Sequence, residues 1–168
     1  MYVAQRGVVW LMTDTDGVGA QLHYMMGGGA SMGDLGGLNY GWAKMTGRMY
    51  PDMWGRVAAV VTFLGFNLTF FPQFVLGYMG MPRRYHAYPP EFQALNVLST
   101  AGASVMGIGY LIPAIYLAWS LKYGAIAGNN PWGAKGLEWE IQSPPPTFNF
   151  DKTPVVTEPA YAYETREK

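Results

Sequence analysis

The uncharged stretch Val57-Ala-Ala-Val-Val-Thr-Phe-Leu-Gly-Phe-Asn-Leu-Thr-Phe-Phe-Pro-Gln-Phe-Val-Leu-Gly-Tyr-Met79 decides the fold of this chain. As a helix it is long enough to cross a hydrocarbon core of roughly 30 Å. Pro72 frees a backbone carbonyl within it, which a spanning helix tolerates where neighbouring groups satisfy that carbonyl. Residues 94–121 form a second uncharged stretch, in which Pro113 predicts a kink. The alternative for both stretches is a helix buried in a large soluble core.

A third apolar segment, residues 17–43, is weaker because it contains nine glycines and carries Asp34 near its middle. An aspartate at the centre of a spanning helix costs about 2.5–3.5 kcal/mol on insertion scales. Small residues nevertheless recur every fourth position, a spacing that lets helix backbones approach closely in lipid. They are Gly29, Gly33, Gly37 and Gly41, and again Ser99, Ala103 and Gly107. Coincidence in a glycine-rich chain is the alternative.

These segments predict an all-α membrane protein with three transmembrane helices, at about residues 17–43, 57–79 and 94–121. The membrane domain then covers residues 17–127. It follows a segment of uncertain structure, 1–16, which lacks the order of a cleavable signal peptide. Residues 128–168 form a polar tail that is rich in proline, and proline favours an extended, solvated backbone. The alternatives for the tail are a disordered linker and docking through Trp132 and Trp139.

Composition excludes several classes of protein. The formal net charge is zero, so the charge gives no reason to expect nucleic acid as a partner. Cysteine is absent, which excludes disulfides, thiolate metal sites and thiol nucleophiles. With only two histidines, His23 and His86, a zinc enzyme built from this chain alone is not expected.

The distribution of charge predicts an orientation in the membrane. The loop of residues 44–56 carries three basic side chains against the single Asp52, so we place it on the cytoplasmic side. The pair Arg83–Arg84 then lies on the outer side, and the carboxyl-terminal tail returns to the cytoplasm. This topology fits an integral, multi-pass protein of a bacterial-type inner membrane, in contact with membrane lipid.

Two features carry chemistry. Arg83 and Arg84 adjoin in the loop Gly80–Tyr88, where they either anchor helix ends or bind carboxylates through their paired N–H groups. His23 lies inside a predicted membrane helix, where it either ligates a haem iron or bonds a neighbouring helix. In a regular helix Asp34 would share its face, about 20° away and about 16 Å along the axis.

Six motifs, in order, resemble subunit I of the haem–copper terminal oxidases, in the cytochrome c oxidase branch. They are Lys44-Met-Thr-Gly-Arg-Met-Tyr, Gly65-Phe-Asn-Leu-Thr-Phe-Phe-Pro-Gln-Phe, Gly80-Met-Pro-Arg-Arg-Tyr, Asn130-Pro-Trp-Gly-Ala, Gly136-Leu-Glu-Trp and Ser143-Pro-Pro-Pro. The resemblance covers about residues 14–163. It implies that the three helices are the last three of a twelve-helix bundle.

The resemblance implies roles for several residues. His23 matches an axial ligand of the low-spin haem, and Arg83 and Arg84 match a pair that binds haem propionates. Asp14 matches the carboxylate of a His-Asp pair at a magnesium or manganese ion, but Thr13 stands at the histidine. Gln21 stands at the proximal histidine of the high-spin haem, and an amide is not a usual axial ligand.

The implied function is that of the carboxyl-terminal part of cytochrome c oxidase subunit I, which couples electron transfer to oxygen with proton translocation in aerobic respiration. Copper and the high-spin haem would then need the missing helices, other oxidase subunits would be partners, and cytochrome c would be the expected electron donor. Two alternatives remain. One is a degenerate, non-catalytic scaffold that has lost the high-spin site, and the other is a structural subunit without haem.

Overall fold

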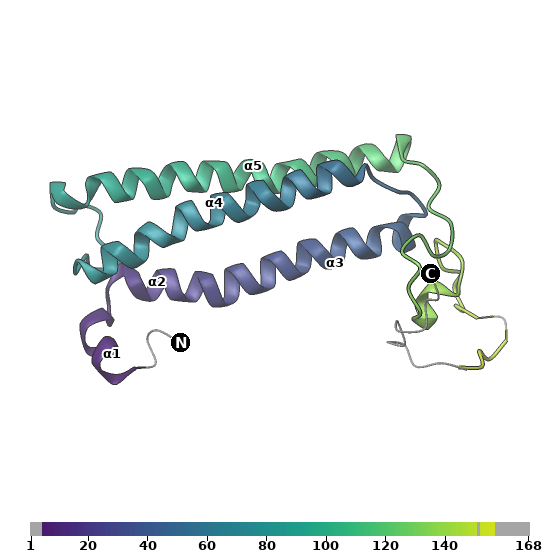
Figure 1. Ribbon diagram of the computed structural model, residues 1–168, viewed down its shortest axis with the longest axis horizontal. Helices are drawn as coiled ribbons and strands as arrows, with labels where there is room; N and C mark the ends of the chain where they lie inside the picture. Colours follow the sequence, from purple (N-terminus) through teal and green to yellow (C-terminus); the bar gives the residue numbers. More distant parts are fainter. Residues whose placement is uncertain (1–4, 151, 157–168) are drawn as a thin grey trace, which may run out of the picture. The chain divides into compact units, whose positions relative to one another are not determined.

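The structure is a computed structural model that describes residues 5–150 and 152–156, and the chain is mostly helical (Figure 1). The α-helices are α1 (Arg6–Met12), α2 (Asp16–Leu22), α3 (Gly29–Thr46), α4 (Asp52–Tyr78) and α5 (Gln93–Tyr123). A π-helical segment, η2 (His23–Gly28), joins α2 to α3, and short 3-10 turns lie at η3 (Pro90–Phe92) and η4 (Leu137–Trp139). Within the described residues there is no β-strand, so the predicted helical class is confirmed.

Two helical stretches are long and apolar enough to cross a membrane, Asp52–Tyr78 and Pro90–Tyr123. Only 39% and 28% of their most apolar windows are buried within the chain, whereas the core helix of a soluble protein is mostly buried. Many of their exposed side chains are large and apolar, as lipid or further helices require. These two predicted spans are therefore supported by composition, length and exposure together.

The third predicted span is helical from Asp16 to Thr46 but is not among the two stretches apolar enough to cross a membrane. Its glycines and Asp34 lower its hydropathy. The π-helical segment within it also turns the chain by less than 100° per residue. The angle of 20° that a regular helix would place between His23 and Asp34 therefore does not apply.

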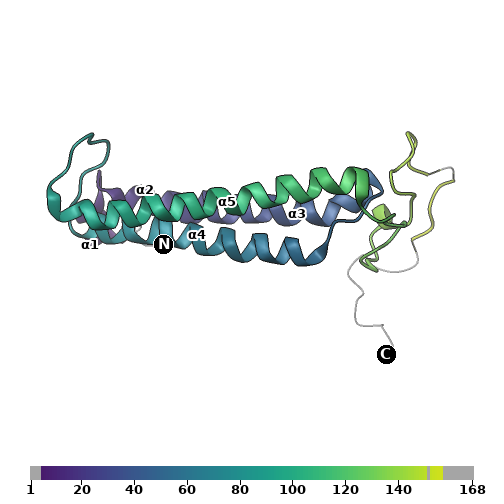
Figure 2. The same ribbon diagram turned by 90° about the horizontal axis from the view of Figure 1, so that it is seen from above.

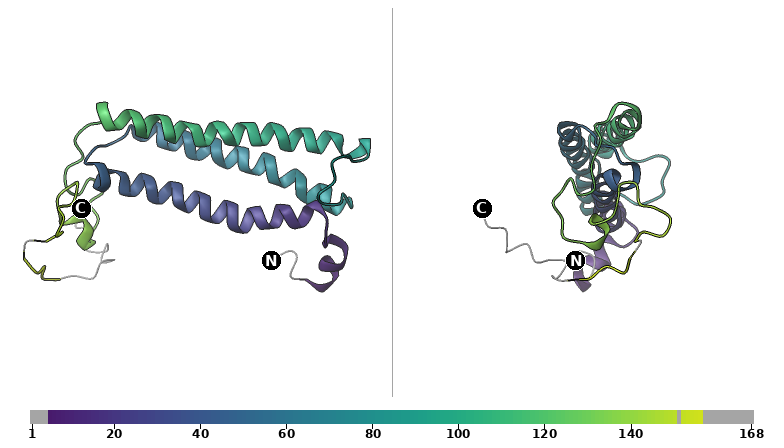
Figure 3. Two further views of the ribbon diagram at one scale, coloured as in Figure 1. Left: turned by 180° about the vertical axis from the view of Figure 1, so that it is seen from behind. Right: turned by 90° about the vertical axis from the view of Figure 1, so that its right-hand side faces the viewer.

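The chain divides into two compact units, which we describe separately. The first contains the described residues up to Leu35 together with Asp52–Ile115, and the second contains Gly36–Pro51 with the described residues from Tyr116 onward. In the first unit α4 and α5 lie side by side (Figures 1 and 2). Figure 3 shows that the short helix α1 leaves the line of α2.

Glycine lets the backbones of α4 and α5 touch. A Cβ on Gly65 would overlap the backbone of Met106, and a Cβ on Gly102 would overlap that of Leu68 and Thr69. Of the predicted small-residue stripes, only Ser99 takes part in this contact. A Cβ at Gly29, Gly33, Gly37 or Gly107 would meet nothing within 4 Å. The contact instead uses alternating steps of three and four residues along α5, at Ser99, Gly102, Met106 and Gly109.

A polar group from the neighbouring helix bonds the backbone of α4 close to Pro72. Ser99 Oγ on α5 donates to the carbonyl of Thr69, 2.8 Å away, and Gln73 Nε2 donates to Ser99 Oγ at 3.2 Å. Thr69 lies three residues before Pro72, and Gln73 directly follows it. Pro72 itself is buried. One backbone carbonyl beside the proline, that of Thr69, thus accepts a hydrogen bond inside the helix pair.

In the second unit, the residues after α5 pack on the end of α3. Lys44 Nζ donates to the carbonyls of Asn129 (3.0 Å) and Ile141 (2.7 Å) and lies 5.2 Å from the centre of the Trp139 ring. Trp132 Nε1 donates to the carbonyl of Tyr40 at 2.9 Å. This part of the predicted tail therefore docks through both tryptophans on its own chain.

Candidate functional site

His23 opens the π-helical segment, and its imidazole is held by two contacts. Its Nδ1 lies 2.8 Å from the carbonyl of Gly19, one turn earlier, and its ring stacks on Phe70 of α4 with centroids 4.3 Å apart and planes inclined by 13°. A carbonyl oxygen only accepts, so Nδ1 carries the proton. In the neutral ring Nε2 then keeps its lone pair, the state of a histidine ready to ligate a metal.

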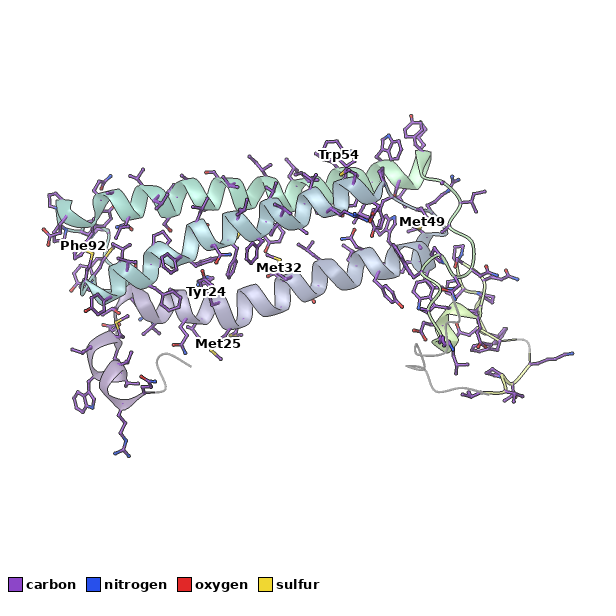
Figure 4. The ribbon with its side chains drawn as sticks, in the orientation of Figure 1. Tyr24, Met25, Met32, Met49, Trp54 and Phe92 are labelled. Carbon is purple, nitrogen blue, oxygen red and sulfur yellow. The ribbon has the colours of Figure 1, made fainter. Side chains whose placement is uncertain are left out.

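Tyr24, the next residue, points toward α4, whereas Met25 points away from it (Figure 4). Tyr24 Oη donates to Asn67 Oδ1 at 2.8 Å, and its ring contacts those of Phe66 and Phe74. Asn67 Nδ2 in turn donates to the carbonyl of Phe63 at 2.8 Å. These contacts fix the rotation of η2 against α4, and with it the direction in which His23 points.

Glycines lie one turn before and one turn after His23. A Cβ on Gly19 would meet nothing within 4 Å, and one on Gly27 would touch only Phe66 and His23 itself. The histidine side chain is exposed. An exposed imidazole of fixed tautomer, with a glycine one turn away on either side along the helix, fits one axial position of a haem.

Gln21 lies two residues before His23, and Met25 one turn after Gln21. Gln21 Nε2 donates to Met25 Sδ at 3.6 Å, and the Met25 side chain is 53% exposed. Residues two apart point about 200° apart on a regular helix, so Gln21, in the regular helix α2, occupies a different face from His23, and Met25 contacts it there. That face presents an amide and a thioether and no imidazole.

The second part of the site is a short antiparallel pairing between two segments that are far apart in sequence. The N–H of Arg83 donates to the carbonyl of Asp14 at 3.0 Å, and the N–H of Asp16 donates to the carbonyl of Met81 at 3.1 Å. Thr15 and Pro82 face each other between them. The structure thus brings two of the sequence-predicted residues, Asp14 and Arg83, side by side at the start of α2.

The arginine loop has an unusual backbone. Arg84 has a φ of 64° and Asp14 a φ of 65°, in the left-handed region that few residues other than glycine adopt. Such outliers persist where the surroundings impose them, and they occur often at ligand-binding sites. Among the described residues, neither the Arg83 nor the Arg84 guanidinium makes a hydrogen bond or an ion pair, so their donors are available to a ligand.

The described residues contain no group of three or more histidine, cysteine or acidic side chains that could hold a metal ion. Asp14 can therefore supply at most one carboxylate to an ion whose other ligands come from elsewhere. Sequence reasoning also missed the residues that support the site, namely Phe70, Tyr24, Asn67 and Asp16. Phe70 and Asn67 lie in a quoted motif, but only the packing of α2 and η2 on α4 indicates what they contact.

The comparisons with known proteins agree with the resemblance. The family model for cytochrome c and quinol oxidase polypeptide I matches residues 1–105. Cytochrome c oxidase subunit 1 of Thermostichus vulcanus is 41% identical over 150 residues, covering 89% of this chain and 27% of that protein. Cytochrome c oxidase subunit 1 of Synechocystis sp. is 45% identical over 143 residues, covering 85% of this chain and 26% of that protein.

A haem–copper oxidase subunit I+III of Aeropyrum pernix is 43% identical over 152 residues, which is 90% of this chain and 18% of that protein. The chain thus spans about a quarter or less of the length of the curated relatives that it matches.

Proposed function

The chain belongs to the family of haem–copper oxidase subunit I, of which it is a partial member, and from this premise we propose that it supplies one axial ligand and a propionate clamp to the low-spin haem of a respiratory oxidase. In this proposal His23 is the iron ligand, and Arg83 and Arg84 hold the propionates. When bound, the haem supplies reversible one-electron chemistry. The chain's own residues bind it, orient it and set its charge environment.

One observation carries the proposal. The hydrogen bond from His23 Nδ1 to the Gly19 carbonyl fixes the tautomer that leaves Nε2 open. Metal-ligating histidines usually donate their other N–H to a backbone carbonyl or a carboxylate, which orients the ring and raises its basicity. The stacked Phe70 ring restricts rotation of the imidazole plane in addition.

The arginine loop supports the second role. Two guanidinium groups adjoin at the end of a helix pair, with their N–H donors unused inside the described chain. Paired N–H groups recognise carboxylates with two parallel hydrogen bonds, which a haem propionate would accept. The backbone of Arg83 is tied to that of Asp14, so the start of α2 and the clamp form one structure.

The remaining expectations concern the whole protein. We propose that residues 17–43 form a third spanning helix of a membrane domain at residues 17–127, that the arginine loop lies on the outer side of a bacterial-type inner membrane, and that the tail at residues 128–168 is cytoplasmic. The other helices of subunit I would supply copper, the high-spin haem and the oxygen chemistry, with proton translocation. Other oxidase subunits and a donor such as cytochrome c would complete the assembly.

A second candidate is a non-catalytic scaffold that keeps only the low-spin haem. Gln21 favours it, because its amide bonds Met25 and offers no imidazole on that helix face. Counting the haems in the purified complex separates the two candidates. One haem for each complex supports the scaffold, and two haems with oxygen consumption support the oxidase.

The proposal is tested by replacing His23 with alanine in the assembled, detergent-purified complex. We expect loss of the low-spin haem band from the reduced-minus-oxidised visible spectrum, with the subunits still assembled. His86→Ala is the matched control, because this histidine is exposed in the loop and makes no described contact. A low-spin band that survives His23→Ala contradicts the assignment.

A further inference from the structure

The last turn of α5 carries an exposed group of two aromatic side chains and one cation. Trp119 and Tyr123 lie one turn apart, are 46% and 60% exposed, and have ring centroids 5.7 Å apart. Lys122 lies on the same side of the helix, and its Nζ is 5.3 Å from the centre of the Tyr123 ring. This contact holds the ammonium group beside the exposed rings.

A second cation is fixed at the same helix end. Arg48, in the segment after α3, donates from Nη1 to the carbonyl of Gly124, the residue that follows α5, at 2.9 Å. Its backbone is held there as well, because Arg48 and Ile126 face each other in a short antiparallel bridge. In the part of the chain that the structure describes, neither Arg48 nor Lys122 forms an ion pair within 4.0 Å. Two cations without a counter-ion therefore adjoin the end of α5.

The position of this group along the chain points to the membrane interface. The stretch Pro90–Tyr123, which is long and apolar enough to cross a membrane, ends at Tyr123 itself. At the ends of spanning helices, tryptophan and tyrosine rings lie at the level of the lipid headgroups, and lysine and arginine side chains extend toward the water. The ammonium of Lys122 would then lie at the depth of the lipid phosphates, and the ring of Trp119 one turn deeper.

We propose that Arg48 and Lys122 bind the phosphate of an anionic phospholipid, and that Trp119 and Tyr123 contact the upper part of its acyl chains. Charge decides the occupant of this surface. An anionic headgroup neutralises the two cations, whereas a zwitterionic headgroup brings a cation of its own and an apolar helix leaves both cations without a partner. The inference goes beyond the proposed function, because it requires α5 to span a membrane and does not involve the haem.

The test is photo-crosslinking of the assembled complex in phosphatidylcholine vesicles that contain a small fraction of a photoactivatable lipid. The probe is phosphatidylglycerol in one sample and phosphatidylcholine in the other, and mass spectrometry locates the labelled peptides. We expect phosphatidylglycerol to label the end of α5 more than phosphatidylcholine does. Lys122→Gln should lower that labelling about fivefold, which is the contribution of one basic side chain near an anionic lipid surface.

Two variants serve as controls. Lys122→Arg keeps the charge and should label as the parent does, and Lys152→Gln removes an equal charge from an exposed lysine of the tail and should also leave the labelling unchanged. In the parent complex, high salt should weaken labelling by phosphatidylglycerol, a measurement that needs no variant. Equal labelling by the two lipids, no labelling of this helix end, or unchanged labelling in Lys122→Gln overturns the proposal. Each of these results leaves the assignment of His23 standing, since that is tested by the haem spectrum.

Discussion

The imidazole of His23 lies flat on the ring of Phe70, with centroids 4.3 Å apart and planes inclined by 13°. The two residues come from neighbouring helices, and Phe70 is itself almost fully buried at 7% exposure. A buried ring cannot turn freely, so it holds the imidazole plane in one orientation. In a haem site, the orientation of that plane is one of the properties that the protein controls.

Replacing Phe70 with leucine should therefore change the low-spin haem without removing it. The variant loses an aromatic pair worth about 0.5–1.5 kcal/mol and frees the imidazole to rotate. We expect a broadened electron paramagnetic resonance signal of the oxidised low-spin haem. Phe71→Leu is the matched control, because Phe71 is the next residue and is 62% exposed. Identical spectra in both variants would mean that the stacking does not orient His23.

Tyr24 should contribute to stability through a single hydrogen bond. Tyr24→Phe keeps the ring contacts with Phe66 and Phe74 but removes the donor to Asn67 Oδ1. We expect a loss of about 1 kcal/mol or less, since such bonds inside membranes are worth little more than in water. Thermal unfolding of the complex in detergent measures it. Tyr78→Phe, at a side chain that is 79% exposed, should not alter the unfolding midpoint.

The sequence predicts α4 and α5 well, because an uncharged run of this length has few alternatives to a spanning helix. It singles out His23 and the arginine loop as candidate site residues because polar groups stand out against apolar surroundings, and their roles stay predictions. It does not predict η2. A π-helical segment depends on how one helix packs on its neighbour. The hydrogen bond of Tyr24 with Asn67 of α4 joins residues that lie 43 positions apart in the sequence.

The local sequence pattern also does not predict the pairing of Asp14 with Arg83, which are far apart in the chain. Their backbones meet where Gly17 and Gly77 let α2 and α4 approach closely. Except at Ser99, the sequence does not predict the contact face of α5, for a related reason. A repeat of exactly four residues drifts around a helix of 3.6 residues per turn, so the real contact alternates steps of three and four residues.

Two glycines of α5 give a direct test of that contact face. Gly102→Ala places a methyl group against the backbone of Leu68 and Thr69, whereas Gly107→Ala places one in open space. We expect Gly102→Ala to destabilise the helix pair by about 1–3 kcal/mol, because backbone cannot move aside as a side chain can. Gly107→Ala should be neutral or slightly stabilising. Thermal unfolding in detergent compares them, and equal midpoints would contradict the packing described above.

Lys44 should control how firmly the residues after α5 hold to the end of α3. Burial lowers the pKa of Lys44, and the charge of Glu138 opposes this effect, as expected for a cation partly removed from water. Lys44→Met keeps most of the apolar stem but removes the donors to the Asn129 and Ile141 carbonyls, each a charged hydrogen bond worth about 1.5–3 kcal/mol. We expect faster cleavage after the aromatic residues Trp132 and Trp139 in limited chymotrypsin digestion.

Lys122→Met, at an exposed lysine that contacts only its neighbour Tyr123 in the described part of the chain, should digest at the parent rate. Equal rates for both variants would show that Lys44 does not hold this segment.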